Sequence, residues 1–352
     1  MIFARWTPAR SVEQLAAALA AGDGPRSERA FAALLKAAGR ARPAELAAAG
    51  PALAGLLPSL PPEPRGLAAV LVGACVESGA DPAACAGPVL TGLAGTLREA
   101  VRFSVLWSAV SSDDPPEFSF EEADGPGRAD AATTALGGPE APGVRAAVAA
   151  RGTLDSWERA AVAVLAHPAG RAAVPDRAAL LADVDALGGA DRLRCLQYAL
   201  LVLDDEPLVV LHRPTGRGFA LRMSGVGDTF QLHTLLADVL INGGHLAGTG
   251  PTAQAAALCR TDNVAPERRP TTTGSFNLCG PDGTWIWNEG TPQDIPVVDG
   301  VRLLVLDPPP YVRHWPAGRF FPGMAADLVL ERVLTPDEAR ARLDRTAPAE
   351  RC

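Results

Sequence analysis

The sequence predicts the α+β fold class, with an all-helical domain over residues 1–205 and a mostly antiparallel α+β domain over residues 206–352. The 352 residues exceed what one typical hydrophobic core accommodates. The first part is rich in Ala and Leu at helical spacing. In the second part, short apolar runs separated by Gly, Pro and Asp are typical of strands and turns. The pattern therefore changes from helix to sheet just after the acidic residues at 204 and 205.

Capping residues mark several helix starts in the first domain. Ser11 and Gln14 form an S-x-x-Q capping box. Asp81 is followed by Pro82, which is favoured at the first helical position. Short tandem helices must bury their apolar faces against neighbours, so the succession resembles helical-repeat proteins of the HEAT type. The sequence has no fixed repeat period, and a globular all-helical domain is equally compatible with it.

Residues 111–143 interrupt the helical pattern. The segment is rich in Asp, Glu, Pro and Gly and contains few apolar residues. Such a composition does not bury enough apolar surface to offset the entropy of ordering the chain. We therefore predict an acidic, flexible loop within the helical domain.

The second domain begins with a hairpin followed by a helix. Residues 208–212 and 219–223 are rich in Val, Leu and Phe, and a Pro-Thr-Gly-Arg turn separates them. Asp228 and Gln231 form a D-x-x-Q variant of the capping box. They predict a helix from residue 229 to about residue 241, which the following Asn-Gly-Gly ends.

Two further hairpins, a strand and a terminal helix follow. Residues 275–279 and 284–287 flank a Gly-Pro-Asp-Gly turn, and residues 296–298 and 301–306 flank an Asp-Gly turn. Residues 327–334 are expected to form the last strand. The sequence Thr-Pro-Asp-Glu from Thr335 is a capping box that opens the helix.

Composition excludes several classes of protein. The net charge is −8, and the sequence lacks the basic patch of a nucleic-acid-binding protein. No apolar run is long enough for a membrane span, and the first residues lack the apolar core of a signal peptide, so we expect a soluble, cytoplasmic protein. Six cysteines without a C-x-x-C pair favour neither a structural metal site nor a disulfide framework.

One segment resembles a known catalytic motif. Residues 301–311 (VRLLVLDPPPY) resemble the strand followed by Asp-Pro-Pro-Tyr of amino-group methyltransferases. In that family the Asp and the prolyl backbone hold the target amine and the aromatic residue stacks on it, which implies these roles for Asp307 and Tyr311. The family also binds S-adenosylmethionine at a Gly-rich turn, to which residues 224–228 are comparable. Here an additional proline changes the register of Tyr311, and the hairpins of residues 270–306 differ from the alternating strands and helices of that fold.

A cysteine–histidine pair is a second candidate for catalysis. Cys259 and Cys279 occur in the same domain as His233, and a nearby imidazole is the base that activates a thiol nucleophile. The same residues lack the spacing of a metal site.

The favoured interpretation is a binding or scaffold protein without a cofactor. Aromatic and charged residues are concentrated in one region, and alternation in the hairpin puts Trp285 and Trp287 on one face with Ile286 on the other. Aromatic side chains interspersed with Arg are typical of binding hot spots. The expected contact residues for a protein, peptide or small-molecule ligand are Trp285, Trp287, Glu289, Tyr311, Arg313, His314, Trp315 and Arg319. The alternative is a group-transfer or hydrolytic enzyme that uses the Cys/His pair or the methyltransferase-like segment.

Overall fold

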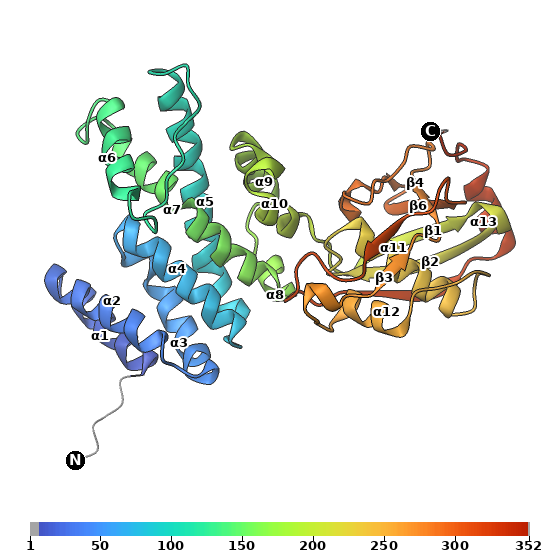
Figure 1. Cartoon of the computed structure of the whole chain (residues 1–352), viewed down its shortest axis with the longest axis horizontal. Coiled ribbons are helices and arrows are strands. Elements are labelled where there is room, and N and C mark those ends of the chain that lie inside the picture. Colours follow the sequence, from blue (N-terminus) through green and yellow to red (C-terminus); the bar gives the residue numbers. More distant parts are fainter. Residues whose placement is uncertain (1–6, 351–352) are drawn as a thin grey trace, which may run out of the picture. The chain divides into compact units, whose positions relative to one another are not determined.

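A computed structural model describes residues 7–350 of the chain. The chain divides into two compact units, Met1–Leu200 and Leu201–Cys352. The first is helical, and the second combines helices with a mostly antiparallel sheet, as the predicted α+β class requires (Figure 1). Within residues 7–350, no helix combines the length and apolar composition that crossing a bilayer requires.

The helical unit is built from helices, most of them joined by short connections, with a longer one between α5 and α6. Several begin where the sequence predicts: the Asp81 carboxylate accepts a hydrogen bond from the amide of Ala83 at 3.0 Å and so caps the helix that starts at Pro82. The elements are α1 (Pro8–Ala20), α2 (Gly24–Ala38), α3 (Pro43–Leu56), η1 (Leu57–Ser59), α4 (Pro62–Glu77), α5 (Pro82–Ser108), α6 (Gly125–Ala135), α7 (Val144–Leu165), α8 (Pro168–Ala172), α9 (Arg177–Ala186), η2 (Gly189–Asp191) and α10 (Arg194–Leu201).

Helix α7 packs against both α4 and α5, at positions where a glycine lets the partner approach closely. A Cβ atom on Gly73 of α4 would lie 3.2 Å from the Cα atom of Ala160. A Cβ atom on Gly92 of α5 would lie 2.0 Å from the ring of Trp157. Close packing in the core of this unit therefore requires glycine at these two positions as well as apolar side chains around them.

The acidic segment differs from the predicted flexible loop, because residues 125–135 within it form α6. Phe118 and Ala129 are buried in a cluster with Phe103 of α5. Glu117 forms an ion pair with Arg192 at 3.3 Å. The prediction of a continuous loop was wrong because the few apolar residues of this segment reach one common cluster, a long-range contact that charge content does not reveal.

The second unit contains a six-stranded sheet and a separate two-stranded one. In the larger sheet the strand order is β4-β6-β1-β2-β8, with β5 also paired to β6. Strands β1 and β6 are parallel and the other pairs are antiparallel. The elements are β1 (Glu206–His212), η3 (Arg213–Thr215), β2 (Arg217–Ser224), α11 (Thr229–Ala237), η4 (Asp238–Asn242), α12 (Ala253–Arg260), η5 (Pro266–Arg268), β3 (Thr271–Thr273), β4 (Asn277–Cys279), η6 (Pro292–Asp294), β5 (Val297–Val298), β6 (Val301–Asp307), β7 (His314–Pro316), β8 (Asp327–Val333) and α13 (Pro336–Leu343).

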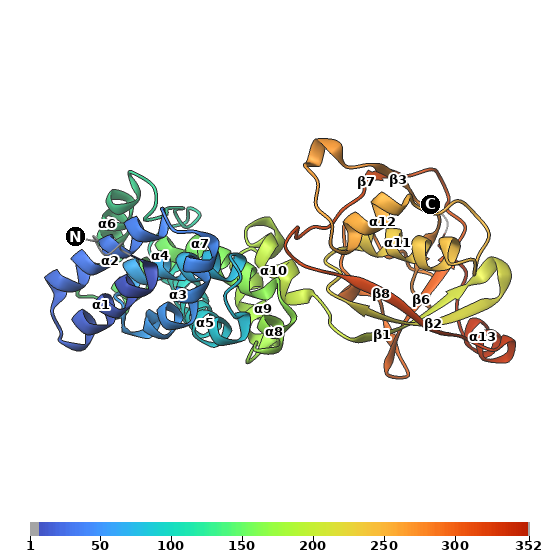
Figure 2. The same cartoon turned by 90° about the horizontal axis from the view of Figure 1, so that it is seen from below.

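Helices α11 and α12 cover one face of the sheet (Figure 2). Leu232 and Leu236 of α11 are fully buried against strand residues such as Val210. Asp228 caps α11 by accepting a hydrogen bond from the Gln231 amide at 2.7 Å, as predicted. The Gln231 side chain accepts from Gly227 at 2.9 Å, so the second bond of the predicted capping box involves Gly227.

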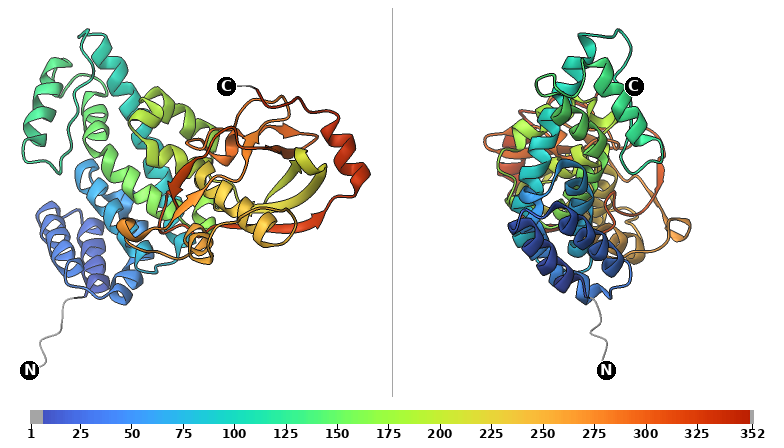
Figure 3. Two further views of the ribbon diagram at one scale, coloured as in Figure 1. Left: turned by 45° about the vertical axis from the view of Figure 1, so that its right-hand side comes forward. Right: turned by 90° about the vertical axis from the view of Figure 1, so that its left-hand side faces the viewer.

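Helix α13 packs on the opposite face, beside the β1–β2 hairpin (Figure 3). The predicted capping box forms at its start: Thr335 accepts from the Glu338 amide at 3.3 Å, and Glu338 accepts from the Thr335 amide at 2.8 Å. Ala339 is buried in a small cluster with Leu211 of β1 and Leu334.

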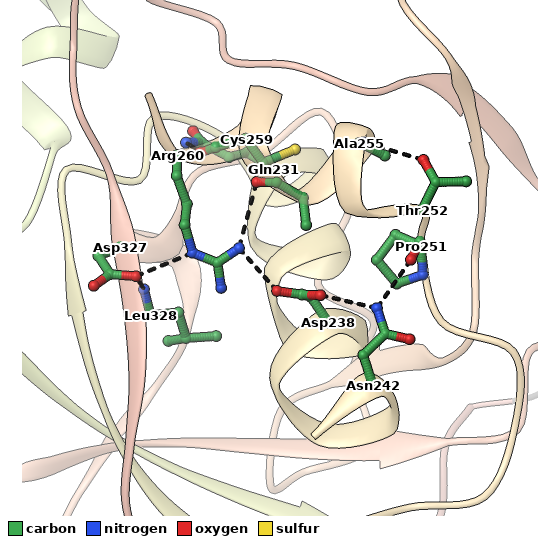
Figure 4. Close-up of polar contacts among 11 residues, drawn as sticks. Gln231, Asp238, Asn242, Pro251, Thr252, Ala255, Cys259, Arg260, Asp327 and Leu328 are labelled. Carbon is green, nitrogen blue, oxygen red and sulfur yellow. Dashed lines mark hydrogen bonds and ion pairs between the residues drawn. The ribbon is translucent and has the colours of Figure 1, made fainter. Parts of the chain in front are cut away.

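Arg260 at the end of α12 ties three elements together (Figure 4). Its guanidinium lies 2.8 Å from the carboxylate of Asp238 in η4 and 3.2 Å from that of Asp327 in β8. Gln231 of α11 donates to the carbonyl oxygen of Cys259 at 2.6 Å. These contacts fix the helical layer on the sheet.

Candidate ligand-binding surface

The predicted hairpin forms only in part: Trp285 pairs with Cys279 of β4 through a single antiparallel bridge, and residues 284–287 form no strand. The amide of Ile286 donates to the carbonyl oxygen of Leu278 at 2.8 Å, and that of Gly280 donates to Thr284 at 2.8 Å. Alternation puts Ile286 in the core, where it is 8% exposed, and leaves Trp287 62% exposed. The two indole rings lie side by side, with centroids 5.8 Å apart and planes inclined by 56°.

The backbone around Trp287 is held on both sides. Ile286 is buried before it, and Asn288, which is 4% exposed, follows it. The Asn288 carbonyl oxygen accepts from the amide of Phe230 at 3.2 Å. Because the residues on both sides of Trp287 face the interior, the Trp287 side chain faces the solvent.

A second group of exposed side chains follows β6. Tyr311 and Val312 are 52% and 71% exposed. The Arg313 guanidinium lies 5.6 Å from the centroid of the Tyr311 ring, a cation–π arrangement, and donates to the carbonyl oxygen of Phe276 at 2.9 Å. Phe276 directly precedes β4, so both groups adjoin the same stretch of chain, residues 276–278. We call Trp285, Trp287, Tyr311, Val312 and Arg313 the aromatic–arginine surface.

Two predicted contact residues are instead part of the interior. Trp315 is 6% exposed, and its indole N–H donates to Thr234 at 3.2 Å. Arg319 is also 6% exposed and donates to the carbonyl oxygens of Leu258 and Thr261. Both side chains hold loops against the helical layer, so their assignment to a contact surface is corrected.

The remaining predicted contacts, Glu289 and His314, are exposed. The His314 ring nitrogen Nδ1 lies 3.0 Å from the Thr273 hydroxyl, across the β3–β7 pair. These residues lie outside the aromatic–arginine surface as defined.

His233 and Cys259 are both buried inside the sheet unit. His233 is fully buried, and its Nε2 accepts from the amides of Ser275 and Phe276 at 3.0 and 3.1 Å. Burial, with Arg313 nearby, lowers the pKa of His233 to about 3. Burial raises the pKa of the Cys259 thiol to about 11. A thiol and an imidazole that both stay neutral at pH 7 lack the thiolate character of a Cys–His nucleophile.

Cys279 and Asp307 are likewise buried. Burial, together with the Asp307 carboxylate, raises the pKa of the Cys279 thiol to about 12. Asp307 accepts from Arg213 at 2.9 Å, so in this structure its carboxylate binds a guanidinium where the methyltransferase motif would hold an amine. Within residues 7–350, His, Cys, Asp and Glu side chains form no group that could hold a metal ion.

Comparisons of the chain with protein-family models, with curated proteins and with solved structures find no match. Sequence reasoning overlooked two features of the surface. Val312 follows the recognised Pro-Pro-Pro-Tyr run and could have been noticed as an apolar residue in a polar loop. The Trp285 indole N–H donates to the carbonyl oxygen of Glu350 at 3.2 Å, and no local pattern links residues so far apart in sequence.

Proposed function

We propose that this chain is a binding protein that recognises a peptide or protein segment through the aromatic–arginine surface. The observation that carries the proposal is the exposure of Trp287 on a backbone anchored at both sides. Exposed aromatic residues next to an arginine are the residue types that dominate binding energy at interfaces. A cytoplasmic location belongs to the same proposal.

The physical chemistry of the surface supports a macromolecular ligand. The backbone that carries Trp287 is anchored on both sides, so a ligand that covers the ring orders little of the protein main chain. Burying most of an exposed indole would contribute about 3 kcal/mol. The Arg313 guanidinium lies over the Tyr311 ring and offers hydrogen-bond donors for a ligand carbonyl or carboxylate.

The enzyme alternative has less support. Its thiol candidates, Cys259 and Cys279, have raised pKa values because they are buried. Asp307 is buried and forms an ion pair with Arg213, whereas Tyr311 is exposed on the surface. The two residues therefore do not form one site.

The proposal can be tested by selecting peptides from a random library displayed on phage against the immobilised full chain. Selected peptides are then titrated against wild type, Trp287→Ala and Val329→Ala. Val329 is the matched control, because it is an exposed apolar residue of the same unit, 50% exposed on β8. We expect at least a tenfold loss of affinity in Trp287→Ala and no change in Val329→Ala. Equal affinity of all three proteins, or a library that yields no binder, would contradict the proposal.

A further inference from the structure

One residue of the aromatic–arginine surface, Trp285, and the turn that precedes it are already in contact with a stretch of the chain itself, residues 346–350. The amide of Ala347 donates to the carbonyl oxygen of Pro281 at 2.8 Å. The amide of Glu350 donates to the carbonyl oxygen of Gly283 at 3.0 Å. The Glu350 carbonyl oxygen in turn accepts from the Trp285 indole. These residues therefore lie along the 280–285 turn and are held there by main-chain hydrogen bonds.

Two features of the turn accommodate this backbone. Gly283 has a φ of +87°, and a Cβ atom there would lie 2.1 Å from the carbonyl oxygen of Pro348. Arg213, held by its ion pair with Asp307, donates to the carbonyl oxygen of Ala347 and to the hydroxyl of Thr346. A glycine and a partly buried guanidinium thus both contact main-chain atoms of the segment.

The side chains of the segment contribute much less. Ala347 and Ala349 are half-buried and small, while Pro348 and Glu350 are exposed. The segment is therefore held mainly through its main chain, which is also the source of affinity when an extended peptide binds along a protein backbone. The last of these hydrogen bonds is donated by Trp285, whose ring lies beside that of Trp287.

We infer that the ligand of the aromatic–arginine surface is an extended peptide that lies along the 280–285 turn, and that residues 346–350 occupy the same site until the ligand displaces them. This inference rests on the proposed function and adds the mode of recognition to it. An external peptide must compete with a tethered one, whose effective concentration is on the order of millimolar. Affinity is therefore lower when the segment is bound, and release of the segment raises it.

The inference can be tested with a labelled peptide of sequence Arg-Thr-Ala-Pro-Ala-Glu, identical to residues 345–350. The full chain is compared with the double variant Ala347→Pro/Glu350→Pro, which removes both donating N–H groups. Ala349→Pro is the matched control, because the N–H of Ala349 takes no part in these bonds. We expect at least tenfold tighter binding of the peptide to the double variant than to the other two proteins. Equal binding, or none to any of the three, would overturn the inference.

A second measurement uses the wild-type chain and so does not depend on the folding of a variant. Amide hydrogen exchange of Ala347 and Glu350 is followed with and without a library-selected peptide whose affinity falls in Trp287→Ala. Faster exchange at both amides in the complex supports displacement. Unchanged exchange would overturn the inference while leaving the proposed function standing, whereas failure of every peptide to bind would overturn both.

Discussion

Trp157 of the helical unit and Trp287 of the sheet unit have opposite environments. Trp157 of the helical unit is 2% exposed, and the absence of a side chain at Gly92 makes room for its ring. Trp287 of the sheet unit is 62% exposed, because the neighbouring Ile286 and Asn288 face the interior. The same residue type thus completes a core where a glycine opens space, and forms a surface where strand alternation turns it outward. Substitutions can separate these two uses.

The largest difference is expected between the buried and the exposed tryptophan of the sheet unit. Trp315→Ala removes a ring packed against Phe230 and His233, and should lower the free energy of unfolding by about 3–5 kcal/mol. Trp287→Ala should change it by less than about 0.5 kcal/mol. Urea unfolding of both variants measures this. Similar losses in the two would show that the Trp287 ring is part of the core.

A somewhat smaller effect is expected from glycines of α5. Gly92→Ala places a methyl group within the Trp157 ring position and should lower the free energy of unfolding by about 2 kcal/mol. Gly95→Ala, one turn further along the same helix, meets no atom within 4 Å and should raise it by about 0.5–1 kcal/mol. Urea unfolding measures both values. A change of the free energy of unfolding in the same direction for both substitutions would contradict the prediction.

The sheet unit should also lose stability in mild acid through His233. Burial holds its pKa at about 3 in the folded state, below the ordinary value of 6.5. The unfolded chain therefore binds the proton first, and stability that is present above pH 6.5 is lost as the pH falls toward 3. Between pH 7 and pH 5 the contribution is about 2 kcal/mol. His233→Gln, which can still accept from the Ser275 amide, should remove that part of the pH dependence; an unchanged slope would contradict the account.

The smallest effect concerns α13 on the second face of the sheet. Thr335→Ala removes the hydroxyl that caps this helix and should cost about 1 kcal/mol, while Thr335→Ser should cost less because it keeps the hydroxyl. Thermal unfolding of the pair measures the difference. Equal loss in both would show that packing of the Thr335 methyl group matters more than the cap.

Features specified by neighbouring residues could be predicted from the sequence. The Asp299–Gly300 turn joins β5 and β6 as expected, with φ of 52° and 80° at the two residues. The caps at Asp81, Asp228 and Thr335 also form where expected. Each of these depends on a few adjacent side chains, which a sequence displays directly. The capping box predicted at Ser11 and Gln14 was wrong, because α1 begins earlier, at Pro8, and Thr7 caps it.

Features that depend on distant residues could not be predicted. Alternation identified the shared face of Trp285 and Trp287 but could not tell that Trp315 would meet α11 and become buried. The contacts of Arg213 with Asp307 and with residues 346–347 also form only when the two ends of the sheet unit come together. For the candidate site, the sequence therefore supplied the residue types and the structure decided which of them reach the surface.

The most direct test of the central claim is a hydrogen-exchange footprint of a library-selected peptide on the full chain. The account predicts slower exchange upon binding at residues 284–289 and 310–314, which carry the aromatic–arginine surface. The helical unit offers an alternative, an apolar groove of about 430 Å³ lined by Leu15, Leu19 and Phe31 among other residues. Protection confined to the helices that line this groove, with none at residues 284–289, would contradict the account.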